Sequence, residues 1–375
     1  MNLNYDIEIG RSKRARRTYS LDEVALVPSR RTRDPREVST DWKIDAYTFG
    51  TPFLGAPMDS VTSPATAIAM GRMGVLGVLN LEGLWTRYDD PEPLLDEIAG
   101  LSADDLPAAT RRMQEIYRRP IRPELITQRL GEIRESGVIV AGALTPQRTQ
   151  EHYRTVLEAG VDLFVIRGTT VSAEHVSQAD EPLDLKRFIY DLDVPVIVGG
   201  AAGYTPALHL MRTGAAGVLV GFGGGASMRT EQVLGIHAAG ASAISDVAAA
   251  RRDYLDESGG RYVHVIADGG VGNSGTIVKA LAMGADAVML GTALARADEA
   301  PGRGWHWGAE AHHGEVPRGV RTRVSSAGPL QEVLHGPSSQ VDGSSNLVGS
   351  LRRAMSTTGY LDLKSFQRTE VVVHG

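Results

Sequence analysis

Short apolar runs alternate with helix-length segments from residue 52 to residue 291. Eight runs have the length and β-rich composition of buried parallel strands, at residues 52–56, 75–80, 138–141, 162–167, 195–199, 217–221, 264–267 and 287–291. Helical periodicity fills the intervals, at residues 64–73, 123–136, 145–159, 184–192, 205–213, 245–256 and 274–283. The pattern predicts an α/β fold, a closed (β/α)8 TIM barrel, with an open doubly wound sheet as the alternative.

The segments outside this alternation predict additions to one barrel domain that spans residues 1–375. Residues 1–50 are polar and irregular, which is typical of an N-terminal lead wrapped on a barrel. Residues 83–122 mix acidic and basic groups and predict a helical insertion. Residues 296–345 form a long loop after strand eight, expected to be a lid or disordered, and residues 346–358 regain a helical pattern. Three helices end at a glycine that we expect to act as a C-cap, Gly160, Gly214 and Gly284.

The sixth run is followed by a loop that has four glycines in the five positions from Gly221 to Gly225. Ligands bind at this end of the strands in barrels and open α/β sheets. Glycines there let backbone amides approach an anion, or they simply make a tight turn. The loop alone leaves both readings open.

Charge and composition narrow the function. The chain carries 45 acidic and 39 basic residues, a net charge of −6. This charge lacks the basic excess that is typical of proteins that bind nucleic acid. The basic stretch 11–17 is interpreted as a solvated arm or subunit contact. No run of 18 apolar residues and no secretory signal is present, so we expect a cytoplasmic protein without membrane contact. The absence of cysteine excludes disulfides, thiolate metal sites and a cysteine nucleophile.

The seventh and eighth runs end in residues suited to a sugar phosphate. Asp268 stands before two glycines, Gly269 and Gly270, and the eighth run ends in Gly291 and Thr292. Glycine amides after these strands commonly cradle phosphate, and a carboxylate there can accept two hydrogen bonds from a ribose diol. The structural alternative is that Asp268 caps the next helix or meets an arginine at the barrel mouth.

Several motifs together resemble the IMP dehydrogenase and GMP reductase family. They are Ala56-Pro57-Met58-Asp59-Ser60-Val61, Ile266-Ala267-Asp268-Gly269-Gly270, Met289-Leu290-Gly291-Thr292 and Asp298-Glu299-Ala300-Pro301-Gly302, and the match runs over nearly the whole chain. No segment near residue 83 is long enough for the paired CBS domains of full-length IMP dehydrogenases. The chain is therefore most similar to the short actinobacterial proteins related to IMP dehydrogenase.

The resemblance implies a homotetramer that binds a purine 5′-monophosphate in guanine nucleotide biosynthesis. It places the phosphate on Gly270, Gly291 and Thr292, the ribose on Asp268, and further substrate contacts on Met58, Gly225 and Ser227. It assigns an NAD site to Arg167, Gly221 and Gly223. It also implies a monovalent cation such as potassium on the carbonyls of Gly223, Gly225 and Met228.

The catalytic slot departs from the family. Family members attack C2 of the purine with a cysteine thiolate from this loop and pass hydride to NAD, but the slot here holds Met228, followed by the family threonine at Thr230. A thioether has no proton to lose, so it cannot replace a thiolate. Other replacements remove ligand contacts: Ala226 and Ala56 for serines, Gly200 for an asparagine, and Arg167 for the aspartate that holds the ribose of NAD. The family's flap motif Arg-Gly-Met-Gly is not found, and the nearest candidate is Arg318-Gly319-Val320.

Substitutes for the nucleophile are few. Ser227 adjoins the slot, and only His237 lies near it in sequence as a base. His306, His312 and His313 are candidates for acid–base work, although histidines in a glycine-rich loop more often face solvent.

Two functions therefore remain open. The first is an NAD-linked oxidoreductase acting on IMP or a related monophosphate. The second is an inactive purine-nucleotide-binding protein that regulates or joins a complete IMP dehydrogenase.

Overall fold

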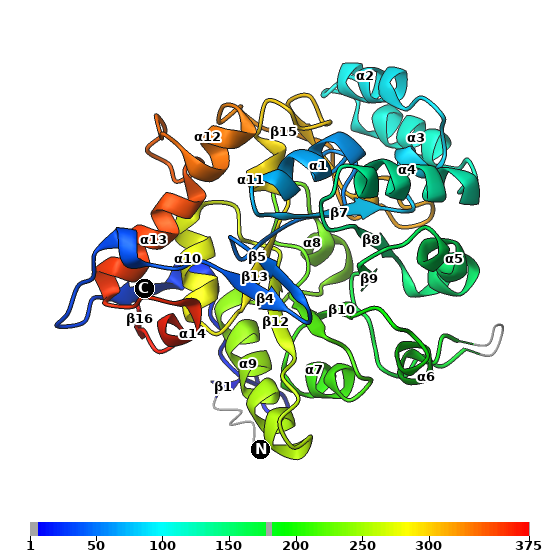
Figure 1. Cartoon of the computed structure of the whole chain (residues 1–375). Helices are drawn as coiled ribbons and strands as arrows, with labels where there is room; N and C mark the ends of the chain where they lie inside the picture. The colour runs from blue at the N-terminus through cyan, green and yellow to red at the C-terminus, as the bar shows by residue number, and fades with distance from the viewer. Residues whose placement is uncertain (1–6, 178–181, 375) are drawn as a thin grey trace.

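The computed structural model describes residues 7–177 and 182–374, and eight parallel strands close into a barrel at its centre (Figure 1). Around the barrel the strands follow chain order, and the last pairs with the first. They are β6 (Phe53–Gly55), β7 (Leu76–Asn80), β8 (Ala141–Leu144), β9 (Leu163–Arg167), β10 (Val196–Ala201), β11 (Gly217–Val220), β12 (His264–Asp268) and β13 (Ala287–Leu290). The closed ring confirms the predicted (β/α)8 barrel and excludes the open sheet.

Helices surround the ring because each strand is followed by a segment with one apolar face. The barrel helices are α1 (Pro64–Arg72), α4 (Pro123–Glu135), α5 (Pro146–Glu158), α6 (Leu185–Tyr190), α7 (Tyr204–Met211), α9 (Gly240–Glu257), α10 (Ser274–Ala282) and α13 (Leu347–Thr358). Gly160, Gly214 and Gly284 follow α5, α7 and α10 with φ of 79°, 98° and 117°. These positive values confirm that the three glycines end their helices.

Two element starts differ from the predictions by three residues or more. The third strand begins at Ala141 rather than at residue 138, because residues 138–140 only cross from α4 to the barrel and Val140 N donates to the Asp162 carboxylate. Helix α9 begins at Gly240, five residues before the predicted start at 245. Its first turn carries small residues because the N-terminal lead packs there: Tyr19 N donates to Ser242 Oγ, and a Cβ on Gly240 would lie 3.2 Å from Leu21 Cγ.

The insertion between β7 and β8 is helical, as predicted. It consists of α2 (Glu92–Gly100) and α3 (Leu106–Tyr117), which lie together at one edge of the molecule (Figure 1). Short helices complete the chain: α8 (Thr230–Leu234), α11 (Thr292–Ala295), α12 (Leu330–His335) and α14 (Leu363–Phe366). The 3-10 turns span Leu21–Glu23, Pro35–Glu37, Leu84–Thr86 and Ala309–His312.

Residues 296–345 are ordered into several elements, contrary to the expectation of a loop without secondary structure. Strand β14 (Trp305–His306) pairs with β15 (Thr322–Arg323), and α12 follows. Within residues 296–345, Trp307 and His306 are only 1% and 2% exposed. The segment therefore packs against the rest of the protein, which its glycine-rich composition does not predict.

The ends of the chain and the lead brace the barrel. Strand β3 (Val24–Val27) pairs antiparallel with β16 (Glu370–Val373), so the N-terminal lead is joined to the C-terminal segment. The hairpin of β4 (Trp42–Ile44) and β5 (Tyr47–Phe49) covers the N-terminal end of the strands, where Trp42 Nε1 donates to His264 Nδ1 at 3.3 Å. A further short pair joins β1 (Ile7–Glu8) to β2 (Arg14–Ala15). Within the described residues, no helix is long and apolar enough to cross a membrane.

Candidate functional site

The carboxyl ends of the strands enclose a cavity of about 300 Å³. Two glycine segments form its walls, residues 223–228 after β11 and residues 268–273 after β12. The remaining predicted substrate residues also line it: Met58, Gly291 and Thr292. Chain positions more than 200 residues apart thus meet at one mouth, as the parallel barrel requires.

The two glycine segments are in direct contact, which explains part of their composition. A Cβ on Gly269 would lie 2.3 Å from the carbonyl oxygen of Gly223, and one on Gly221 would lie 2.6 Å from that of Asp268. Side chains at these two positions would push the loops apart. Gly270, by contrast, has nothing within 4 Å of its notional Cβ, so its backbone borders open space. The loop is therefore both a tight turn and a wall of exposed backbone.

Met228 lies at this cavity, as the sequence predicts. Its amide donates to Gly225 O at 3.0 Å, and its side chain packs partly into the core. A Cβ on Gly308 would lie 2.6 Å from Met58 Cε and 3.3 Å from Met228 Cε. Two thioether methyl groups therefore converge where a thiolate would have to work, and neither can ionise.

Residues 318–320, the nearest candidate for the flap motif, contact the same loop. Arg229 N donates to Arg318 O at 2.8 Å, and Val320 N donates to Ser227 O at 2.7 Å, which makes a β-bridge between Met228 and Gly319. Residues 318–320 are thus held against the loop that carries Met228.

Asp268 and Arg167 form an ion pair across the barrel mouth. Arg167 Nε donates to Asp268 Oδ2 at 2.9 Å, and the two side chains are 19% and 10% exposed. Burial by itself lowers the pKa of Arg167, but the charges of Asp268 and Glu310 outweigh burial and raise it. Asp268 thus meets a barrel-mouth arginine, the alternative raised from the sequence, while Asn273 caps α10. One carboxylate oxygen stays available, and its contact with ribose remains a prediction.

Ser227 has no activating base. Its side chain is 1% exposed, and its hydroxyl has no hydrogen-bond partner among the described residues. His237 lies 3.3 Å from Glu231 instead and does not line the cavity. A serine nucleophile at this position therefore lacks the proton acceptor it needs.

His306 is buried and lines the cavity, so the expectation that it faces solvent is wrong. Ser60 Oγ donates to Trp307 O at 2.9 Å, which uses its single proton, and it lies 3.0 Å from His306 Nδ1. Nδ1 must then carry the imidazole hydrogen and donate to Ser60, which leaves Nε2 as an acceptor. Burial lowers the pKa of His306 to about 4, so the ring is neutral at pH 7.

His312 and His313 have different surroundings from His306 and from each other. His312 stacks on Tyr117 with ring centroids 3.5 Å apart, and burial, with a contribution from Arg87, lowers its pKa to about 3. His313 is exposed, as expected, and its Nδ1 accepts from the amides of Glu315 and Val316.

A second cavity, of about 700 Å³, adjoins the first over β7, β8 and β9. Arg167 lines both cavities, and Arg318 closes one side by donating to Thr169 Oγ1 at 2.8 Å. Gly221 and Gly223, predicted with Arg167 to hold a dinucleotide, do not line this second cavity. Gly200 is also unable to carry a longer side chain, because its notional Cβ lies 2.4 Å from Gly221 O.

The carbonyls predicted to hold a monovalent cation are mostly engaged. Gly225 O accepts from Met228 N, and Met228 O accepts from Arg229 Nη1 at 2.6 Å. The same guanidinium nitrogen donates to Ala226 O at 3.2 Å. Of the three predicted carbonyls, Met228 O thus already accepts from a side-chain cation, and Gly225 O is used by a backbone amide. In the described part of the chain, no cluster of His, Asp or Glu is suited to a metal ion.

Comparisons with known proteins agree with this architecture. A family model described as IMP dehydrogenase / GMP reductase domain matches residues 18–312. An uncharacterized oxidoreductase of Mycolicibacterium smegmatis is 50% identical over 98% of this chain and 99% of its own length. The inosine-5′-monophosphate dehydrogenase of Aquifex aeolicus is 30% identical over 68% of this chain and 52% of its own length.

A solved structure is also similar throughout. The crystal structure of an IMP dehydrogenase/GMP reductase-like protein from Corynebacterium glutamicum has a TM-score of 0.93 and 50% identity. The match covers 98% of this chain and 97% of that one.

Proposed function

Because the chain belongs to the IMP dehydrogenase / GMP reductase family, we propose that its barrel mouth binds IMP or a related purine 5′-monophosphate. The proposal is supported by the cavity that gathers Asp268, Gly270, Gly291 and Thr292 at the ends of two neighbouring strands. Backbone amides and the Thr292 hydroxyl face a phosphate in this proposal, and the unpaired oxygen of Asp268 faces the ribose.

We further propose that the chain does not run the family's covalent reaction. The observation that carries this proposal is the position of Met228 at the cavity, with its methyl group beside that of Met58. Forming a bond from a thioether sulfur to C2 would give a sulfonium ion, with no proton transfer available to stabilise it. The protein then acts by binding nucleotide, as a regulator or partner of a complete relative.

NAD binding is expected to be weak. An aspartate can accept hydrogen bonds from both hydroxyls of a ribose, whereas the Arg167 guanidinium that replaces it has donors only. Arg167 is also held by Asp268 and so is not free to turn toward a dinucleotide in the second cavity.

The test compares nucleotide binding with turnover. Calorimetry with IMP is expected to show binding, and absorbance of NADH in the presence of IMP and NAD is expected to show no turnover. NADH formation at a rate typical of enzymes, about 1 s⁻¹ or faster, would overturn the inactive assignment.

A second candidate function is slow oxidation of IMP without a covalent intermediate, and His306 is the observation that favours it. Its neutral Nε2 lines the cavity beside Gly291 and can accept a proton from water. Water would add across the C2=N3 bond: its oxygen would bond to C2, its proton would pass to Nε2, and the π electron pair would move to N3. That pair would then re-form C2=N3 as hydride leaves C2 to NAD. Slow NADH formation that His306→Gln abolishes, without loss of IMP binding, would establish this route.

The homotetramer remains a proposal, supported by an apolar surface on α8. Val233 and Leu234 are 46% and 42% exposed, and Ile236, just beyond the helix, is 43% exposed. Contact between copies would remove this surface from water. Light scattering after size-exclusion chromatography is expected to give four chains for the wild type and fewer for Leu234→Glu.

A further inference from the structure

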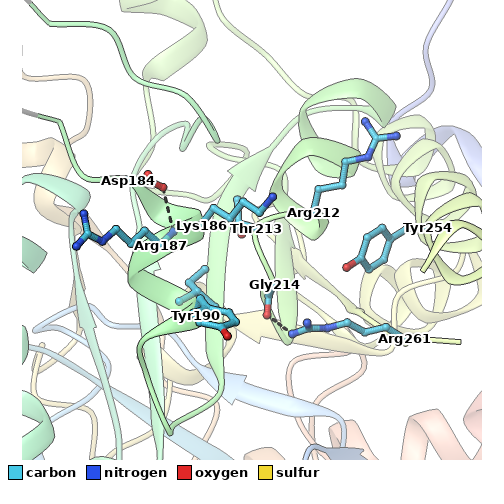
Figure 2. A pocket seen from close by; sticks show the side chains of 10 residues that line it. Asp184, Lys186, Arg187, Tyr190, Arg212, Thr213, Gly214, Tyr254 and Arg261 are labelled. Carbon is cyan, nitrogen blue, oxygen red and sulfur yellow. Dashed lines mark hydrogen bonds between the residues drawn. The ribbon is translucent and has the colours of Figure 1, made fainter. Parts of the chain in front are cut away.

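A hollow of about 560 Å³ lies at the opposite end of the barrel from the candidate site (Figure 2). It is bounded by α6, by the turn after α7 and by the segment that joins α9 to β12. Gly214 and Arg261, which line it, come just before β11 and β12, so the hollow opens at the N-terminal end of these strands. Its residues have no part in the function proposed above.

The lining of this hollow is cationic, although the chain as a whole carries a charge of −6. Four of its side chains are basic and one is acidic: Lys186, Arg187, Arg212, Arg261 and Asp184. Asp184 caps α6 by accepting from Arg187 N at 3.0 Å. Arg212 pairs with Glu257 through two contacts of 2.8 and 2.6 Å. Lys186 and Arg261 have no carboxylate partner in the part of the chain that the structure describes.

The hydroxyl of Tyr254 also faces the hollow. Tyr254 is 7% exposed, and its hydroxyl makes no hydrogen bond to any described residue. Figure 2 shows this hydroxyl directed away from α9, into the space in front of Gly214. Because no described residue takes up this hydroxyl, it is a donor that a ligand in the hollow can use.

The guanidinium of Arg261 is held beside the hollow by a hydrogen bond to the backbone. It donates to the carbonyl oxygen of Gly214, which is available because the helix has ended there. This bond uses one of five N–H donors and fixes the plane of the group beside Tyr254. Figure 2 shows Lys186 extending into the same space from α6, whereas Arg187 extends to the other side of that helix.

We propose that this hollow is a second ligand site, for an anion of the phosphate class. A flexible ammonium, a planar guanidinium and a phenolic hydroxyl together supply the donors that phosphate oxygens accept. Tyr190, which is 87% exposed at the rim, adds an aromatic face on which a nucleoside base could stack. The phosphate chemistry is common to an inorganic pyrophosphate and to a nucleotide, and the experiment distinguishes the two.

The experiment uses the full chain with Ala226→Glu as background, so that an exposed carboxylate repels phosphate from the barrel mouth. Inorganic pyrophosphate and AMP are titrated separately by calorimetry. Lys186→Ala and Tyr254→Phe are each expected to weaken binding roughly tenfold, the effect of losing a hydrogen bond to a charged group. Arg252→Ala is the matched control, since it removes one positive charge from α9 at a position that does not line the hollow.

The outcomes separate cleanly. Binding of pyrophosphate alone supports an inorganic anion as ligand, and binding of AMP with the same dependence on Lys186 and Tyr254 supports a nucleotide. If the background variant binds neither probe, or if Lys186→Ala and Tyr254→Phe bind as tightly as the background, the proposal is overturned. An equal loss in Arg252→Ala would also overturn it, because the effect would then be general surface charge. Thermal unfolding without ligand checks that each variant is folded.

Discussion

The carboxyl group of Asp59 makes the stability of this barrel depend on pH. Asp59 follows β6 and is 3% exposed, and its Oδ2 accepts from Leu84 N at 3.0 Å and from Tyr117 Oη at 2.8 Å. Trp307 Nε1 donates to the same tyrosine at 2.9 Å. Asp59 Oδ1 has no partner among the described residues. One buried carboxyl thus connects the mouth of the barrel, the helical insertion and the segment after β13.

Burial raises the pKa of Asp59 from 3.8 to about 6, despite the hydrogen bonds that favour its charged form. A raised pKa means that the folded protein holds the proton more tightly than the unfolded chain does. The resulting stability is fully present below pH 3.8, is lost as the pH rises, and is absent above about pH 6. The difference corresponds to about 3 kcal/mol.

Asp59→Asn tests this reasoning, because it keeps an acceptor oxygen toward Leu84 and Tyr117 and cannot ionise. The free energy of unfolding in urea, followed by tryptophan fluorescence, is measured for both proteins from pH 4 to pH 8. Relative to the wild type, the variant is expected to gain about 2 kcal/mol over this range, since part of the full difference is already lost at pH 4. Tyr117→Phe removes a hydrogen bond that favours the carboxylate and should move the transition to higher pH. A difference between Asp59→Asn and wild type that does not change with pH would refute the argument.

Three further predictions concern the candidate site. Met228→Cys is expected to produce slow NADH formation from IMP and NAD, since the altered contacts at Ala226 and Arg167 persist; no NADH in a variant that binds IMP would show that the loop does not present the thiol to C2. Asp268→Ala should abolish IMP binding in calorimetry, whereas Arg167→Met should keep it. Binding that survives in Asp268→Ala but is lost in Arg167→Met would show that the arginine, not the aspartate, contacts the ribose. Arg229→Ile should make the melting temperature depend on potassium by freeing the loop carbonyls, while the wild type should melt alike in potassium and lithium chloride.

The periodic parts of the sequence were sufficient to predict the barrel. Apolar runs and glycine C-caps located all eight strands, because residues buried on both sides leave an uninterrupted apolar signal. The third strand was displaced because its residues, Ala141-Gly142-Ala143-Leu144, are small and have weak β propensity. The start of α9 was missed for a related reason, since its small residues are there to receive Leu21 from the lead.

The chemistry of the mouth was only partly predictable. Met228 could be placed because the family resemblance aligns its glycine-rich loop, which follows β11, and the closed barrel brings every strand end to one mouth. The pairing of Arg167 with Asp268 spans two strands that are not neighbours in the ring, so it depends on barrel curvature and side-chain reach. His306 was misjudged because its burial comes from Ser60 and Trp307, contacts that no local pattern records. Arg229 gave no signal, because its role is to donate to backbone carbonyls.

A calorimetric titration of the wild-type protein with IMP tests the central claim most directly. The account predicts saturable binding of one IMP per chain with no consumption of NAD when the dinucleotide is also present. Failure to bind IMP at millimolar concentration would contradict the proposal that this barrel mouth, with a thioether in its catalytic slot, remains a purine monophosphate site.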